Sequence, residues 1–113
     1  MKLSSKDADG VTVIELVGNV LGGPDATALN DTLHKLVDKR KKKVVVDLSG
    51  VQSMNSSGLS MLIGALTTMR NAGGDLKLAA PSKKIESLLV ITKLSTVFEL
   101  HPTVEKATGS FAK

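Results

Sequence analysis

Two adjacent hydroxyl side chains, Ser56 and Ser57, are the residues of this 113-residue chain best suited to chemistry. They follow Asn55 and precede Gly58, between an apolar segment and a segment with helical spacing. A serine at the start of a helix can accept a phosphoryl group, whose charge of about −1.5 to −2 the exposed helix amides can hold. The same polar side chains could instead cap the helix by accepting hydrogen bonds from its first amides. The residue types alone leave both roles open.

The rest of the sequence contains no constellation typical of a small enzyme. It has no cysteine, which excludes thiolate catalysis, disulfides and zinc–thiolate sites. Neither His34 nor His101 stands at metal-ligand spacing, and neither a Gly-x-Ser-x-Gly elbow nor a glycine-rich phosphate loop is present. We therefore expect a binding protein that is not an enzyme and that needs no metal or cofactor.

The charge balance raises the question of a polyanionic partner. The chain carries 15 Lys plus Arg against 11 Asp plus Glu, a formal net charge of +4, and residues 39–43 (KRKKK) supply much of this excess. The run lies between two periodic segments, where a solvated helix end is the plainer interpretation than a nucleic-acid patch. Phe98 and Phe111 are the only aromatic residues, so stacking platforms for nucleic-acid bases are lacking. We expect no nucleic-acid partner.

Length and composition indicate a small soluble protein. With 42% apolar residues, the chain can form one domain over 1–113, with its core at about 9–107. No stretch approaches the roughly 20 apolar residues of a membrane helix, and the start MKLSSKDADG lacks the apolar region of a signal peptide. We expect a cytoplasmic protein that has no membrane partner and is a monomer when free.

The two serines lie between elements of clear type. Residues 44–48 (VVVDL) are almost wholly apolar and predict a buried parallel strand, which a loop over 49–55 follows. Apolar residues at helical spacing then predict an amphipathic helix that ends at a glycine pair: Leu59, Leu62, Ile63, Leu66 and Met69, then Gly73 and Gly74. Functional groups of open α/β sheets gather beyond the carboxyl ends of parallel strands, where Ser56 and Ser57 would stand.

The remaining sequence predicts more strands that alternate with helices. A β-branched strand covers 11–17 and ends at Gly18, and Gly22 and Gly23 break the chain before a helix that begins at Pro24 and stops in the basic run. Further along we expect strands over 75–80 and 97–100, helices that begin near 81–82 and 102–103, and a frayed tail over 108–113. This order indicates an α/β fold with a mixed sheet.

Residues 47–62, DLSGVQSMNSSGLSML, resemble the signature of the STAS domain of bacterial anti-sigma-factor antagonists, usually Asp-Leu-Ser-x-Val-x-x-Met-Asp-Ser-Ser-Gly-Leu. The likeness covers most of the chain, because the opening strand with Gly18, GGPDATAL, AGGDLKLAAPS and LLVITKLSTVFEL stand where that family has similar segments. The resemblance implies the STAS fold: a mixed sheet of four to five strands, with helices packed largely on one side.

The resemblance also implies a regulatory role by partner switching. Family members bind an anti-sigma factor that is also a serine kinase and so release a sigma factor for transcription; phosphorylation reverses the binding. The position that matches the family's phosphorylated serine is Ser56, and Ser57 is its structural neighbour. A PP2C-type phosphatase would be a further partner. The residues expected to contact the anti-sigma factor are Gly22, Gly23, Asn55, Ser56, Ser57, Gly58 and Leu59.

Two departures from the family pattern affect the expected partner. Asn55 stands in place of the usual Asp, which keeps the capping ability but removes a negative charge beside the acceptor serine. Residues 18–24 (GNVLGGP) replace a Gly-Glu-Leu-Asp sequence that several sporulation-type members have. The alternative function is therefore a STAS accessory subunit of a transporter ATPase or a signalling complex, in which the same surface binds without a phosphorylation switch.

Overall fold

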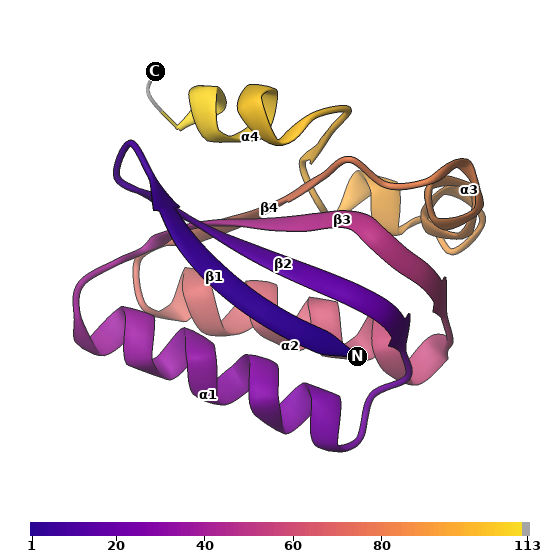
Figure 1. Ribbon diagram of the computed structural model, residues 1–113, viewed down its shortest axis with the longest axis horizontal. Helices are drawn as coiled ribbons and strands as arrows, with labels where there is room; N and C mark the ends of the chain where they lie inside the picture. The colour runs from indigo at the N-terminus through magenta and orange to yellow at the C-terminus, as the bar shows by residue number, and fades with distance from the viewer. Residues whose placement is uncertain (112–113) are drawn as a thin grey trace.

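The computed structural model describes residues 1–111, in which strands and helices alternate along the chain (Figure 1). The strands are β1 (Lys2–Ala8), β2 (Val11–Val20), β3 (Lys43–Met54), β4 (Asp75–Ala79) and β5 (Leu100–His101). The helices are α1 (Pro24–Asp38), α2 (Ser56–Asn71), α3 (Lys83–Ile91) and α4 (Val104–Ser110), with a 3-10 turn, η1, over Leu94–Thr96.

The five strands form one mixed sheet in the order β1-β2-β3-β4-β5, which confirms the predicted α/β class and sheet type. Strand β1 is antiparallel to β2, and the other neighbouring strands are parallel. Because β2, β3 and β4 run in one direction, the connections that leave them for α1, α2 and α3 gather at one end of the sheet. This end, on the right in Figure 1, is where any site on those connections must form.

The helices lie largely on one side of the sheet, as expected. Helices α1 and α2 cover one face, α3 adds Ile85 and Leu89 to the same core cluster, and α4 lies on the opposite face (Figure 1). Strand β3 is buried on both faces, because Val44 and Val46 enter the larger cluster while Val45 enters the smaller one. This double burial explains the continuous apolar run. The smaller cluster under α4 consists of Val11, Val13, Val45, Ala79 and Ala107.

The two central strands are longer than predicted. Strand β2 continues past Gly18, and β3 includes all but the last residue of the segment 49–55, so the expected loop is wrong. The two strands extend together, and the pair of Gly18 and Val51 lies between two register shifts. A Cβ added to Gly50 would lie 2.9 Å from Val17 Cγ2, so this glycine serves a close contact between strands and not a turn.

The outer strands also differ from the sequence prediction. Strand β1 was not predicted, because Leu3 is the only large apolar side chain among mostly exposed polar residues. Its polar character suits an edge strand, which must avoid pairing with other chains. The strand expected over 97–100 is wrong for all but Leu100, since Phe98 instead enters the core beyond η1.

The C-terminal segment is more ordered than predicted. Helix α4 continues through Ser110, so the expected fraying over 108–113 is wrong for its first three residues, whereas Ala112 and Lys113 lie outside the described residues. None of the helices within residues 1–111 combines the length and the apolar character needed to cross a membrane.

A polar cluster fastens α4 to the sheet. The Lys77 ammonium of β4 is buried, lies 2.8 Å from Glu99 Oε2, donates to Ser110 Oγ at 2.6 Å and stands 4.1 Å from the centre of the Phe111 ring. These contacts offset the cost of burying the charge. The pKa of Glu99 is lowered to about 2. The hydrogen bond from Lys77 is the largest cause, and the contact with His101 Nε2 at 2.6 Å is the second.

We expect Glu99→Gln to lower the free energy of unfolding by about 1 kcal/mol near neutral pH, a modest value because solvent screens the half-exposed carboxylate. The depressed pKa of Glu99 means that its stabilisation is present above its ordinary pKa of 4.5 and is lost as the pH falls toward 2. The stabilities of variant and wild type should therefore converge in acid. Urea denaturation along a pH series measures this difference.

The control for this series is Glu15→Gln, on a half-buried glutamate of β2 that makes no ion pair within residues 1–111. It should shift stability little at any pH. A difference between Glu99→Gln and wild type that stays constant down to the acid end would contradict the role given to the Glu99 carboxylate.

Candidate functional site

Ser56 and Ser57 form the first turn of α2, directly after the carboxyl end of β3. Asn55 is the N-cap residue, with extended backbone, and its Oδ1 accepts a hydrogen bond from the Gly58 N–H at 2.8 Å. Both serine side chains are exposed, and within residues 1–111 neither hydroxyl makes a hydrogen bond. The two roles that the sequence left open therefore fall to different residues: Asn55 caps the helix, and the serine hydroxyls face solvent.

The loop between β2 and α1 brings Gly22 and Gly23 to the same place. A Cβ added to Gly22 would lie only 2.7 Å from Ser57 Cβ, and the φ of Gly22, 82°, is in the left-handed region. Only glycine meets both demands, so the loop passes directly over the start of α2. Gly23 is exposed beside it and is the N-cap residue of α1, without a side-chain cap. These two predicted site residues therefore do join the serines.

Gly58 and Leu59 hold the site from inside. A Cβ added to Gly58 would lie 2.1 Å from the carbonyl oxygen of Val20, the last residue of β2. The approaching backbone therefore belongs to β2 of the same chain. Leu59 is 7% exposed and packs in the core. Both residues are buried, and they fix the start of α2 against the sheet.

The electrostatic field at the serines is that of an uncompensated helix start. Helix α2 has 16 residues and no acidic side chain in its first turn, so the positive end of its dipole is exposed. The amides of Ser56 and Ser57 have no intrahelical partner at this position of a helix. Helix α1 begins nearby, with Asp25 in its own first turn. A phosphoryl group on Ser56 would be stabilised here by the α2 amides.

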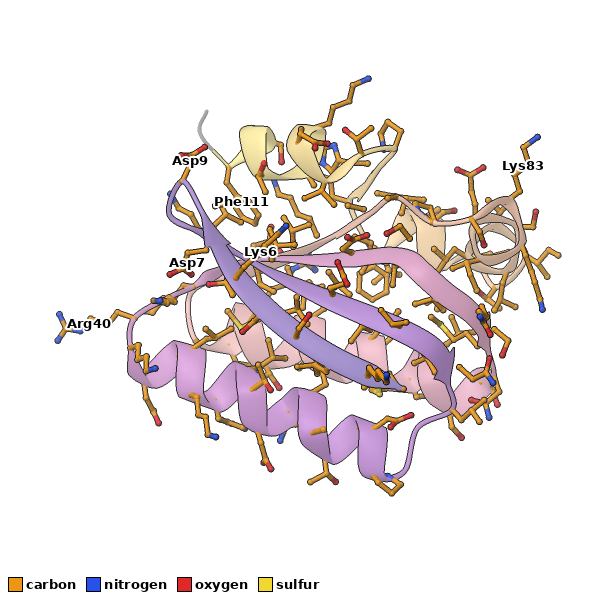
Figure 2. All side chains as sticks on the ribbon, in the orientation of Figure 1. Lys6, Asp7, Asp9, Arg40, Lys83 and Phe111 are labelled. Atoms are coloured by element: carbon orange, nitrogen blue, oxygen red, sulfur yellow. The ribbon has the colours of Figure 1, made fainter. Side chains whose placement is uncertain are left out.

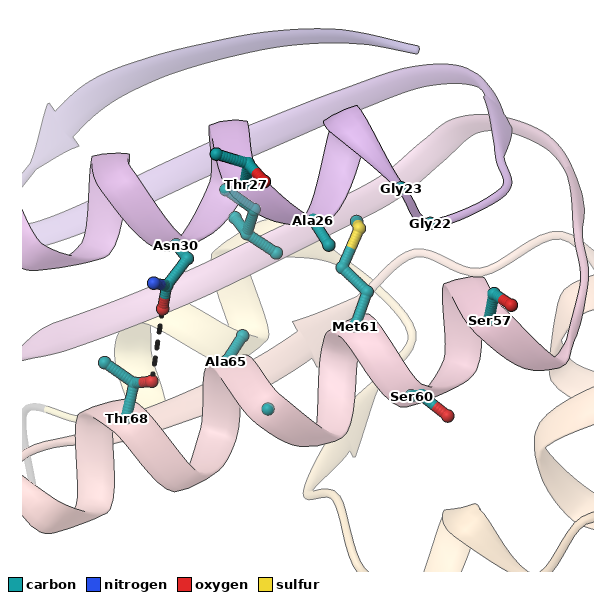
Figure 3. Close-up of a pocket in the computed structure, with 12 residues that line it drawn as sticks. Gly22, Gly23, Ala26, Thr27, Asn30, Ser57, Ser60, Met61, Ala65 and Thr68 are labelled. Carbon is teal, nitrogen blue, oxygen red and sulfur yellow. Dashed lines mark hydrogen bonds between the residues drawn. The ribbon is translucent and has the colours of Figure 1, made fainter.

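A groove of about 470 Å³ runs between α1 and α2, from their first turns to Asn30 and Thr68 (Figure 3). A hydrogen bond from Thr68 Oγ1 to Asn30 Oδ1, 3.4 Å long, joins the two helices at one end of the groove. The groove was not predicted, although small or polar residues at four-residue spacing could have indicated it. Its lining consists of Gly22, Gly23, Ala26, Thr27, Leu29, Asn30, Ser57, Ser60, Met61, Gly64, Ala65 and Thr68.

The site offers acceptor hydroxyls and a surface. Within the described part of the chain, no group of three or more His, Cys, Asp or Glu side chains could hold a metal ion. His34 lies on α1 and His101 on β5, away from the serines in the chain order and in the sheet. The arrangement places two exposed hydroxyls, those of Ser56 and Ser57, at a helix start whose first amides lack intrahelical partners.

Known proteins resemble this chain in sequence and in fold. The family model of the STAS domain matches residues 2–107. A Thermotoga maritima protein that carries the name anti-sigma factor antagonist is 27% identical over 73 residues, which span 65% of each chain. The crystal structure of an anti-sigma factor antagonist from Thermotoga maritima superposes with a TM-score of 0.87 at 21% identity, over 98% of this chain and 95% of that chain.

Two further solved structures have the same fold. An anti-sigma factor antagonist from Mycobacterium paratuberculosis has a TM-score of 0.83 at 25% identity, over 99% of this chain and 94% of that chain. SpoIIAA of Bacillus, in its phosphorylated form, has a TM-score of 0.73 at 15% identity, over 97% of this chain and 99% of that chain.

The close approach of β2 to α2 can be tested with two glycines of the same helix. We expect Gly58→Ala to lower the free energy of unfolding by about 2–3 kcal/mol, because the new methyl group would displace the Val20 carbonyl. The matched variant Gly64→Ala adds its methyl group to open space in the helix interior and should stabilise by about 0.5–1 kcal/mol. Urea denaturation of both variants gives the comparison. Equal effects of the two substitutions would contradict the backbone contact.

Proposed function

The chain belongs to the STAS domain family, and we propose that it acts as an anti-sigma-factor antagonist whose binding is controlled by phosphorylation of Ser56. The observation that carries this proposal is the exposed Ser56 hydroxyl at the start of α2, left free because Asn55 supplies the cap. The names of the relatives from Thermotoga and Mycobacterium support the binding function. The phosphorylated form of SpoIIAA supports a switch on this fold.

In the unphosphorylated state, the first turn of α2 and the Gly22–Gly23 loop present an uncharged surface. A partner can approach this surface closely, because the exposed Gly23 has no side chain and the two serines are short. We expect the anti-sigma factor to dock here and so to be withheld from its sigma factor. The affinity would then depend on the shape and neutrality of the first helical turn.

Phosphorylation would change the charge at this surface without refolding the chain. A kinase partner would join Ser56 Oγ to the γ-phosphorus of its ATP, release ADP and take up the hydroxyl proton on a basic group of its own. The new charge of about −1.5 to −2 rests on the exposed amides of α2 and repels an acidic partner surface. Hydrolysis by a phosphatase would return the serine and release inorganic phosphate, which resets the switch.

Asn55 is the feature that favours the second candidate function. Its amide caps α2 through the same oxygen geometry that an aspartate would use, so the fold does not require a carboxylate. A kinase that recognises the usual Asp would find a neutral side chain beside Ser56. If no kinase accepts this sequence, the protein is a STAS accessory subunit that binds constitutively to a transporter ATPase or signalling complex.

The switch can be tested with two substitutions at Ser56. We expect Ser56→Ala to bind the anti-sigma factor with wild-type affinity, whereas Ser56→Asp should bind at least about tenfold more weakly because it places a permanent charge in the docking surface. The measurement is titration calorimetry against the anti-sigma factors of the host, purified one at a time.

The matched control is Ser60→Asp, which adds the same charge one turn further along the exposed side of α2. It should weaken binding less than Ser56→Asp does. Equal affinity of Ser56→Ala and Ser56→Asp would sink the phosphorylation switch, and co-purification with transporter subunits in place of a kinase would establish the accessory role.

A further inference from the structure

Helix α3 carries an outward-facing stripe that its role in the fold does not explain. Ile91 is 77% exposed and Val90 is 57% exposed, the highest values among the large apolar side chains of residues 1–111. The opposite side of the helix is fully buried through Ile85 and Leu89. The stripe therefore belongs to a well-anchored helix, and its apolar residues are exposed by position and not by fraying.

Lysines continue the same stripe toward the start of the helix. Lys83 stands seven residues before Val90, and Lys84 stands seven before Ile91, so each pair lies on one side of α3, two turns apart. Lys93, just beyond the helix, is also exposed. Figure 2 shows Lys83 projecting from α3 into solvent. We call Lys83, Lys84, Val90 and Ile91 the α3 stripe; Glu86 is the only acidic residue of the helix.

Each part of this surface costs stability in the isolated protein. Lys83 and Lys84 stand in the first turn, where the helix dipole disfavours cations. Val90 and Ile91 are β-branched residues of less than optimal helix propensity, and most of each side chain stays in solvent. Lys93 has a φ of 63°, in the left-handed region that favours glycine. Several local costs on one surface are typical of a functional surface.

The α3 stripe lies at the same end of the molecule as Ser56. Strands β3 and β4 are parallel, so α2 and α3 both begin beyond the carboxyl end of the sheet, on the right in Figure 1. Helix α3 packs against β3, the strand that leads to Ser56. The loop before α1 adds Leu21, which is 51% exposed, beside Gly22. Leu21 thus adds one exposed apolar side chain to the proposed docking surface, and α3 begins at the same end of the molecule.

We infer that the α3 stripe is a second contact element for the anti-sigma factor, which there presents an apolar patch bordered by acidic side chains. This inference rests on the proposed function. Three exposed lysines against one glutamate give the surface a net positive charge, which matches an acidic partner. Burial of Val90 and Ile91 against the partner would supply the apolar centre of the contact. A phosphoryl group on Ser56 would repel the same acidic partner surface. The acidic side chains of the partner would therefore be attracted by the lysines of α3 and repelled by the phosphorylated serine.

A protein partner fits this surface better than a membrane does. Helix α3 has nine residues and exposes two large apolar side chains, neither of them aromatic or Leu. Interfacial membrane helices present a far wider apolar face, rich in Trp, Phe or Leu. The small apolar area with lysines at its border corresponds to the centre and rim of a protein interface.

The test uses two double variants of the full chain and the anti-sigma factor that the wild type binds. We expect Val90→Ser with Ile91→Ser to weaken binding at least about tenfold, with an unchanged melting temperature because both side chains are exposed. Lys83→Glu with Lys84→Glu should also weaken binding and should make it less sensitive to added salt. The matched charge control is Lys39→Glu with Lys42→Glu, in the basic run near Arg40 at the opposite end (Figure 2), which should change affinity less than twofold.

The outcomes separate this inference from the proposed function. If both double variants bind like the wild type while Ser56→Asp loses binding, the α3 stripe is not a contact element for the anti-sigma factor, and the proposed function stands. If the wild type binds none of the host's anti-sigma factors, the proposed function fails and the inference falls with it. Binding to phosphatidylglycerol vesicles that the same substitutions abolish, with anti-sigma-factor binding unchanged, would assign the stripe to a membrane and overturn the inference.

Discussion

A backbone contact between the end of β2 and the first turn of α2 determines the geometry of the site. The Val20 carbonyl oxygen lies so close to Gly58 that a Cβ there would be 2.1 Å away, and it also accepts a hydrogen bond from the Asn55 N–H at 3.4 Å. Glycine is the residue that permits this approach. The contact fixes the start of α2 against the sheet, and the Asn55 cap then leaves Ser56 free to face solvent. Rigidity and exposure of the acceptor serine thus have one origin.

Because the start of α2 is fixed against the sheet, partner binding is more readily controlled by a change of charge at Ser56 than by a change in the conformation of the helix start. The first turn of α2 lacks acidic residues, so no negative side chain would repel a phosphoryl group there. The cap is supplied by Asn55, so a phosphoryl group on Ser56 would not replace it. The surroundings include Leu21 and Asp25 beside the glycine loop, and the lysines of α3 outnumber its single glutamate at the same end of the molecule. An acidic partner would be attracted to this end of the molecule and repelled by a single phosphate at its centre. The cluster around Lys77 holds α4 on the other face of the sheet.

The sequence was sufficient wherever one local rule dominated. The continuous valines of 44–46 predicted a buried strand, and Pro24 predicted the start of α1. It was insufficient where a tertiary contact overrides local pattern. Gly50 belongs to a strand because Val17 packs against it, although Ser-Gly sequences favour turns. Strand β1 has almost no apolar pattern, so the sequence gives no sign of it. Its pairing with β2 is what makes it a strand. The groove between α1 and α2 likewise depends on helix placement.

The measurement that tests the central claim most directly is mapping of phosphate on the protein isolated from its own host, by intact mass and peptide fragmentation. We expect one phosphoryl group, located on Ser56, in a fraction of the molecules that changes with growth and stress conditions. Absence of phosphate under all such conditions, or its location on a residue outside the first turn of α2, would contradict the claim that Ser56 controls partner binding.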